Sequence, residues 1–310
     1  MAKTVEFMTL LAKLEVTQNL DPVPTGGANG LLAFNVKVTP MPGQDAERKR
    51  SLPYFSAPQK FPSGMYREIT FETEMVGHAV AGTQPAWSAI AKAAGLAETL
   101  NAGVSVVYNP IAQGAQTATL YFYRDGTLFK LRGARGDATI KLSAHALPMI
   151  AWKFIGLYDE PTDVANATPT LTGFQQPMVA NKVKTPTFTI NGFAAVMRNF
   201  ELALNSKLIY RELVNSQAVH ITGRDPMIST QIEAESMATL NPFNLAENQT
   251  AFAISLIHGV GAGKIISLSA PSCRMMRPDA ETAQDGIAEW PLKITPLPVA
   301  GNDDFTLTLT

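Results

Sequence analysis

The side chains best placed for chemistry are three carboxylates that alternate along one segment of the chain. Glu68, Glu72 and Glu74 share one face of the strand that the alternation of residues 66–76 predicts. Such carboxylates could bind a cation or act as an acid–base pair, as in a glycoside hydrolase. Because like charges on one strand face repel one another, a solvated face is the simpler interpretation.

A glycine-rich segment, Gly259 to Lys264, is the second candidate, because it resembles a phosphate-binding loop. That loop requires Ser or Thr directly after its lysine, whereas Ile265 follows here. A dinucleotide-binding loop opens a helix, and residues 265–270 instead have the pattern of a strand. The segment therefore favours a hairpin turn with glycine at positive φ.

The remaining reactive side chains form no recognisable site. The histidines lie in separate segments without the spacing of metal ligands, and Cys273 is the only cysteine, so no disulfide forms within the chain. Arg135-Gly136-Asp137 matches an adhesion tripeptide, but we expect no secretion signal, and turn chemistry accounts for it. We therefore expect no catalytic residue, no cofactor and no metal, and a protein that is not an enzyme.

Composition narrows the function further. Charged residues are 16% and hydrophobic residues 46% of the chain, and the net charge is −1, which is typical of a folded protein with little surface charge. A protein that grips nucleic acid through its phosphates would be basic. No apolar stretch approaches the roughly 20 residues that span a bilayer. We expect no membrane partner and synthesis in a reducing cytoplasm.

The elements that position these residues are mainly strands. Alternation and turn residues predict strands at 32–38, 66–76, 104–108, 119–123, 127–131, 140–144 and 151–158. Helical spacing predicts a helix from Thr83 to Leu100 and a shorter one at 241–247. Residues 40–64 place prolines around a charged cluster and are expected to form a long arm.

Three landmarks recur in the same order in both halves of the chain. Gly133–Ala144 and Gly259–Ala270 each read as a glycine-rich turn followed by a strand that ends in Leu-Ser-Ala, and Tyr-Arg-Glu and Trp landmarks recur at 66 and 210 and at 152 and 290. The recurrence predicts a duplication, with domains at 1–160 and 187–310 and a proline-rich linker at 161–186. Chance likeness between two β domains rich in Gly and Ser is the alternative.

The same segments resemble a known family. Residues 121–144, closing at 154–158, together with Asn241-Pro242-Phe243, His258-Gly259 and Gly301-Asn302-Asp303-Asp304, are similar to the tail tube (major tail) proteins of long-tailed bacteriophages. The resemblance implies a mainly β fold of two tandem β-sandwich or open-barrel domains, each with a flanking short α-helix. It also implies a virion protein whose rings stack into a tube that conducts the genome.

Several expectations follow from the resemblance. A duplicated chain would close a pseudo-six-fold ring from three copies, and its partners would be itself and the terminator, tape measure and distal tail proteins. DNA would pass without specific binding along a wall that presents glutamates rather than lysines or arginines; we expect Glu68, Glu72, Glu74, Glu233 and Glu235 to face this lumen. The 40–64 arm would stack one ring on the next. A decoration or tail-completion protein and a carboxylate-based glycoside hydrolase are the alternative functions.

Overall fold

The computed structural model describes residues 3–4, 6–170, 174–261 and 263–310, and these residues form a mainly β protein with short helices. The first half carries α1 (Gly26–Asn29) and α2 (Ser88–Ala93), and the second carries α3 (Pro242–Glu247). The predicted fold class, mainly β with a short helix in each half, is confirmed.

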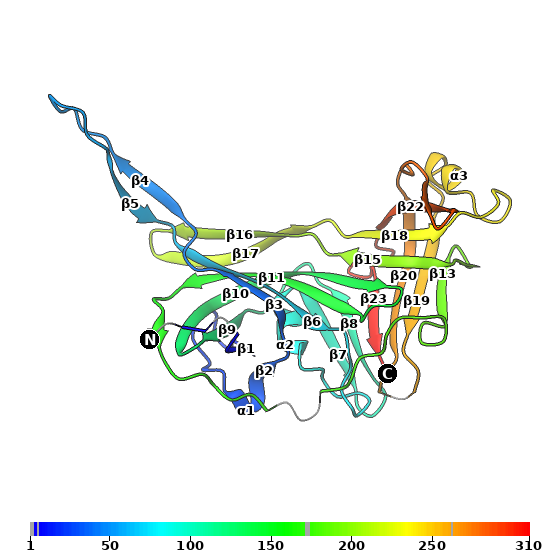
Figure 1. Ribbon diagram of the computed structural model, residues 1–310, viewed down its shortest axis with the longest axis horizontal. Helices are drawn as coiled ribbons and strands as arrows, with labels where there is room; N and C mark the ends of the chain where they lie inside the picture. Colours follow the sequence, from blue (N-terminus) through cyan, green and yellow to red (C-terminus); the bar gives the residue numbers. More distant parts are fainter. Residues whose placement is uncertain (1–2, 5, 171–173, 262) are drawn as a thin grey trace.

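A main sheet runs through both halves of the chain (Figure 1). In spatial order its strands are β3 (Phe34–Thr39), β6 (Tyr66–Glu74), β11 (Met149–Tyr158), β10 (Thr127–Ser143), β15 (Met197–Ala203), β18 (Met227–Glu233), β22 (Ile287–Pro296) and β21 (Thr282–Gln284). All neighbours are antiparallel. The halves meet where β10 pairs with β15, so one continuous sheet connects them.

Other strands close the fold behind this sheet. They are β1 (Met8–Leu14), β2 (Gly30–Leu31), β7 (Leu96–Asn101), β8 (Ser105–Pro110), β9 (Ala118–Arg124), β12 (Thr162–Asp163), β13 (Thr187–Ile190), β14 (Phe193–Ala194), β19 (Phe252–His258), β20 (Ile266–Met275) and β23 (Thr306–Leu309). β23 pairs with β8, which gives the halves a second connection. One hydrophobic cluster includes Phe71 and Trp152 as well as Phe200 and Trp290, so the core is also shared. The proposed domain boundaries remain a prediction.

The glycine-rich segment of the first half does not form the turn that its sequence predicts. Gly133–Asp137 is not a turn but lies inside β10, where the register shifts against both β9 and β11. Gly133 has φ 56°, so its positive φ forms a β-bulge, whereas Gly259, Gly261 and Gly263, also at positive φ, lie between β19 and β20, and the two glycine-rich landmarks are therefore not equivalent. The Tyr landmarks are not equivalent either, because Tyr66 begins β6 while Tyr210 lies in a separate hairpin.

The predicted helix at 83–100 is wrong in its length. α2 covers only Ser88–Ala93, and Gly95, with φ 82°, follows the last helical turn before β7 begins. Residues Leu96–Asn101 then pair with β8, and these pairings take over the backbone groups that a longer helix would have used. The predicted helix at 241–247 is confirmed as α3, whose first turn is capped by the Asn241 side chain, which accepts from Asn244 N at 2.9 Å.

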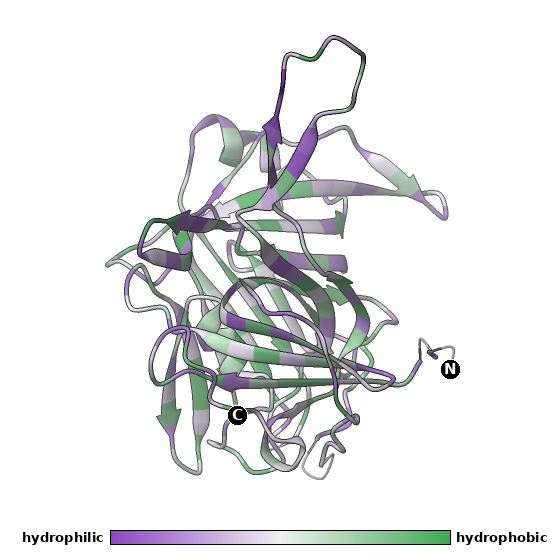
Figure 2. Cartoon of the chain, turned by 90° about the vertical axis from the view of Figure 1, so that its left-hand side faces the viewer, coloured by the Kyte–Doolittle hydropathy of each residue, from purple (hydrophilic) through white to green (hydrophobic). Residues whose placement is uncertain are grey.

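Two hairpins leave the main sheet. The β4–β5 arm (Gln44–Arg48 and Gln59–Ser63) projects away from the rest of the molecule (Figures 1 and 2), so the predicted arm at 40–64 is a hairpin rather than a loop. The β16–β17 hairpin (Ser206–Leu213 and Ser216–Arg224) instead packs against strands β10 and β11 of the main sheet. The β16–β17 hairpin approaches the base of the arm, where the ring of Tyr210 lies 5.2 Å from the ring of Tyr66, the first residue of β6.

Candidate functional site

One face of the main sheet carries charged side chains from strand to strand, and we call it the polar face. The cross-strand register aligns Glu72 with Ala151, Thr139 and Ala203 in turn, which fixes the residues that share this face. Its charged members on the successive strands from β6 to β22 include Glu68, Glu72, Glu74, Lys153, Asp137, Lys141, Glu201, Glu233 and Lys293. The polar face therefore extends over both halves.

The carboxylates of β6 do not stand alone. Lys153 Nζ lies 3.2 Å from Glu68 Oε1, and Lys141 Nζ lies 3.5 Å from Glu72 Oε1. Asn35 Nδ2 also donates to Glu72 at 2.7 Å. Strands β10 and β11 thus bring lysines beside these glutamates, and the expectation that the lumen wall presents glutamates rather than lysines or arginines stays a prediction. Burial raises the pKa of Glu74, the third member of the set.

The second half contributes carboxylates of two kinds. Glu233 continues the polar face on β18, while Glu235 lies beyond the end of that strand. Glu289, opposite Glu233 on β22, is buried and accepts two hydrogen bonds from Arg198 Nε at 2.7 and 2.8 Å. The hydrogen bonds from Arg198 lower the pKa of Glu289. The structure thus brings Glu68, Glu72, Glu74 and Glu233 onto one face and leaves Glu235 at its margin.

The polar face has the chemistry of a mixed-charge surface. A groove of about 390 Å³ on it is lined by Lys37, Glu72, Asp137 and Lys153 among other residues, so it combines two lysines with two carboxylates. Each exposed ion pair contributes only about 0–1 kcal/mol to folding, which makes stability a weak explanation for this arrangement. Its main effect is on the electric field: neighbouring opposite charges largely cancel one another away from the surface, and salt screens what remains beyond a Debye length of about 8 Å.

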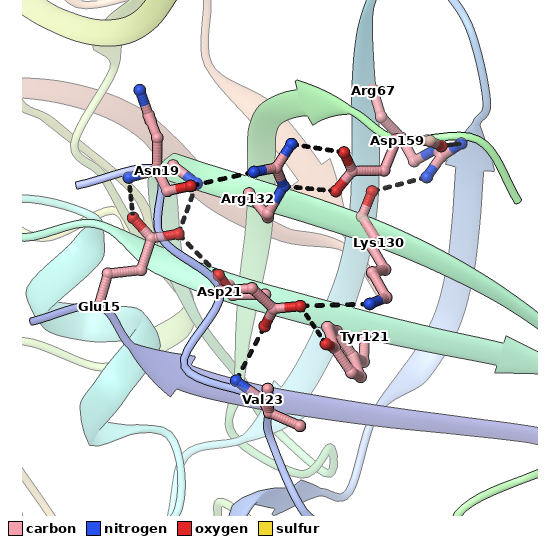
Figure 3. A network of polar contacts seen from close by, with 11 residues as sticks. Glu15, Asn19, Asp21, Val23, Arg67, Tyr121, Lys130, Arg132 and Asp159 are labelled. Atoms are coloured by element: carbon pink, nitrogen blue, oxygen red, sulfur yellow. Dashed lines mark hydrogen bonds and ion pairs between the residues drawn. The ribbon is translucent and has the colours of Figure 1, made fainter. Parts of the chain in front are cut away.

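A polar network connects the N-terminal part of β10 with the base of the arm (Figure 3). Arg132 forms a two-pronged ion pair with Asp159, with both N···O distances 2.6 Å. Asp21 accepts from Tyr121, Lys130 and Val23 N. Burial tends to raise the pKa of Asp21, but these hydrogen bonds and the charge of Lys130 outweigh it and lower that pKa.

Arg67 is the central residue of the same network and is fully buried. Its guanidinium donates to three backbone carbonyl oxygens, those of Pro40 at 3.1 Å, Lys130 at 2.6 Å and Asp159 at 2.8 Å. It also lies over the rings of Phe129 and Tyr158, 5.3 and 5.0 Å from their centroids. Arg67 therefore ties the strand that leads into the arm to the main sheet.

The bulge in β10 is held by a buried carboxylate. Glu15 accepts from Gly133 N at 2.6 Å and from the hydroxyls of Thr117 and Thr119 at 2.7 and 2.6 Å. Beyond the bulge, Arg135 Nη1 donates to Val219 O at 2.8 Å, and Asp137 accepts from Ser206 N at 2.8 Å. The adhesion-like tripeptide thus fastens the β16–β17 hairpin to the sheet.

Among the described residues, the cavity beside α2 does not offer the pair of carboxyl groups that a glycoside hydrolase uses. A cavity of about 300 Å³ near α2 is lined by Glu74, His78, Gln84 and Trp87, and Glu74 is the one carboxylate among its described lining residues. A hydrolase of this type needs two facing carboxyl groups about 5–10 Å apart. Over the described ranges, no group of three or more His, Cys, Asp or Glu residues is arranged to hold a metal ion. Burial raises the pKa of the Cys273 thiol to about 12, which keeps it protonated.

Comparison with known proteins supplies the family. A family model described as phage tail tube protein matches residues 16–310, nearly the whole chain. A search among curated proteins found no match. In the described part of the chain, no helix is long and apolar enough to cross a membrane.

Proposed function

The chain belongs to the phage tail tube protein family, and from that premise we propose that three copies close a ring and that rings stack into the tail tube. The observation that carries the proposal is the continuous main sheet. One chain supplies two sheet segments joined edge to edge through β10 and β15, as neighbouring units in a closed wall would be. Closing the wall removes exposed sheet edges, which otherwise invite uncontrolled pairing.

The polar face is our candidate for the lumen of the tube. Glu68, Glu72, Glu74 and Glu233 on this face, with Glu235 at its margin, would line the path of the genome. The ion pairs of Lys153 with Glu68 and of Lys141 with Glu72 support this role, because a lysine held by a carboxylate is less available to a phosphate. A surface with paired charges neither grips DNA nor repels it over long distances, so the polymer slides.

The β4–β5 arm is our candidate for the contact between rings. Its strands are exposed along both sides, and its tip exposes Leu52, Tyr54 and Phe55, the last completely. Exposed aromatic side chains at a projecting tip are typical of a docking element. The tube ends would be completed by terminator, tape measure and distal tail proteins in the virion, after synthesis in the host cytoplasm.

Electron microscopy and mass measurement of the purified protein test this function. We expect hollow rods or rings, with a ring mass equal to three chains. Six chains per ring would overturn the pseudo-six-fold ring. A flat lattice or a single ring that never stacks would instead favour a decoration or tail-completion protein. Replacing residues 49–58 by a short Gly-Ser turn should leave folded rings that fail to stack, and normal rods would exclude the arm as the contact.

A further inference from the structure

The internal joint between the halves has a defined register. Residues Thr139–Ser143 of β10 pair with Asn199–Ala203 of β15, and Lys141 lies opposite Glu201. The ladder continues at both ends, with Leu204 N donating to Ala138 O at 3.0 Å and Ala144 N donating to Arg198 O at 2.8 Å. Because hydrogen-bonded pairs alternate along antiparallel strands, Lys141 and Glu201 form a non-hydrogen-bonded pair, with Cα atoms about 4.5 Å apart.

The four strands on either side of this joint correspond one to one. In the first half the order is β3, β6, β11, β10, and in the second it is β15, β18, β22, β21. Trp152 lies opposite Phe71 on β6, and Trp290 lies opposite Ile232 on β18. The first strand of each set has a register irregularity at the same place, between Phe34 and Lys37 and between Met197 and Asn199.

This correspondence identifies the residues at the two ends of the sheet. Thr139 lies opposite Ala151, one residue before Trp152, and Thr282 lies opposite Glu289, one residue before Trp290, so Thr282–Gln284 corresponds to Thr139–Lys141. Likewise, Thr39 corresponds to Glu201. Thr39 lies opposite Glu68 and Glu201 lies opposite Ser229, and these partners precede Phe71 and Ile232 by the same number of residues. The outer edges of β3 and β21 are thus the counterparts of the two edges that are joined inside the chain.

Both outer edges are accessible in the isolated chain. Among the described residues, β3 pairs only with β6 and β21 pairs only with β22. All of Thr282–Gln284 is exposed, as are Lys37 and Thr39. The charges are complementary, because β3 carries Lys37 while Glu281 and Asp285 flank β21. An edge with free backbone groups is a ready template for another strand.

We propose that β21 of one copy pairs antiparallel with β3 of the next copy, with Gln284 opposite Thr39, in the register of the internal joint. The proposal rests on the proposed ring and specifies which edges close it. It places Pro40 opposite Ala283, where the internal joint has Leu202 opposite Ile140. Pro40 has no N–H, and its carbonyl accepts from Arg67 at 3.1 Å, so the joint between copies has fewer backbone hydrogen bonds than the internal one.

Disulfide cross-linking of full-length protein tests the register. Thr39→Cys combined with Gln284→Cys should give disulfides between chains under mild oxidation, ending at a three-chain species because the ring closes. A non-hydrogen-bonded pair about 4.5 Å apart lies within the Cα range that a disulfide accepts. The matched control is Lys141→Cys with Glu201→Cys, which should cross-link within one chain. Thr39→Cys with Thr282→Cys, displaced by two residues, should cross-link far less. Native Cys273 is fully buried and does not compete.

The outcomes separate this joint from the ring itself. Assembled particles that give no Thr39–Gln284 cross-link, while the internal control does, would overturn the joint and leave the proposed function intact. Equal cross-linking of the displaced pair would overturn the register. Chains that stay monomeric at every concentration would overturn both the ring and its joint. A ladder that continues beyond three chains would support the joint and contradict the three-copy ring.

Discussion

Replacing Arg67 by Met should destabilise the protein strongly, because it removes the donors of three buried carbonyl groups. The side chain is fully buried, and Met fills most of its volume without offering a hydrogen bond. Each orphaned carbonyl costs about 1–3 kcal/mol, and some of that sum is recovered because no charge has to be buried. We expect a net loss of about 3–5 kcal/mol in the free energy of unfolding, and a fall of roughly 10 °C in the thermal midpoint.

Urea unfolding followed by tryptophan fluorescence measures the loss in the free energy of unfolding. Hydrogen exchange of the Tyr66 amide measures the local loosening beside the lost hydrogen bonds. The Tyr66 amide donates to Pro42 O at 3.0 Å, two residues after the Pro40 carbonyl that Arg67 holds, so its exchange should accelerate. Arg67→Lys keeps the charge but not the planar fork and should lose about half as much stability. Arg211→Met, at an exposed position of β16, is the control and should change stability by less than about 0.5 kcal/mol. If Arg67→Met unfolds within 1 kcal/mol of the unaltered protein, the reasoning is refuted.

Three further predictions concern the bulge, an acid-dependent contact and the polar face. Gly133→Ala should lower the free energy of unfolding, measured in urea, by about 1–3 kcal/mol, because φ is 56° and an added Cβ would overlap Asn19. Gly126→Ala is the control, since its φ is 78° but the space around it is open, and it should lower the free energy of unfolding by less. Burial tends to raise the pKa of Glu98, but hydrogen bonds from Ser88, Tyr108 and Lys92 lower it overall. The contribution of Glu98 to stability is therefore full above the ordinary glutamate pKa of about 4.3 and is lost as pH falls below that value. Glu98→Gln should flatten this part of the stability–pH curve, and an unchanged curve would contradict the assignment. Glu68→Gln with Glu72→Gln frees two lysines and should raise DNA retention at low salt in a filter-binding assay. The slope of log binding constant against log salt concentration should become steeper by up to about 2. Unchanged retention would mean that these lysines do not face the path of DNA.

The local alternation of the chain predicted the strands well, and long-range pairing decided what local patterns could not. Residues 66–76 alternate strictly, and β6 has the buried and outward faces that this alternation requires. Gly133 could not be assigned correctly from its neighbours, because glycine at positive φ serves a turn and a bulge equally. The choice is made by Glu15, whose carboxylate accepts from the Gly133 amide across a long sequence separation.

The polar face was only partly predictable for the same reason. Lys141 and Lys153 each lie in a segment whose alternation places them outward, but only the register of β6, β11 and β10 sets them beside Glu72 and Glu68. The predicted helix at 83–100 shows the opposite case. There, the helical pattern of apolar residues extends past Gly95, and the pairing of β7 with β8 prevails over local propensity.

A cryo-electron microscopy reconstruction of the assembled protein tests the central claim most directly, because it shows both the number of chains in a ring and the direction of the polar face. We predict three chains per ring, with Glu72 and Lys141 on the channel surface and the β4–β5 arm reaching the next ring. A map with the polar face on the outer surface of the particle, or with six chains in each ring, would contradict the account.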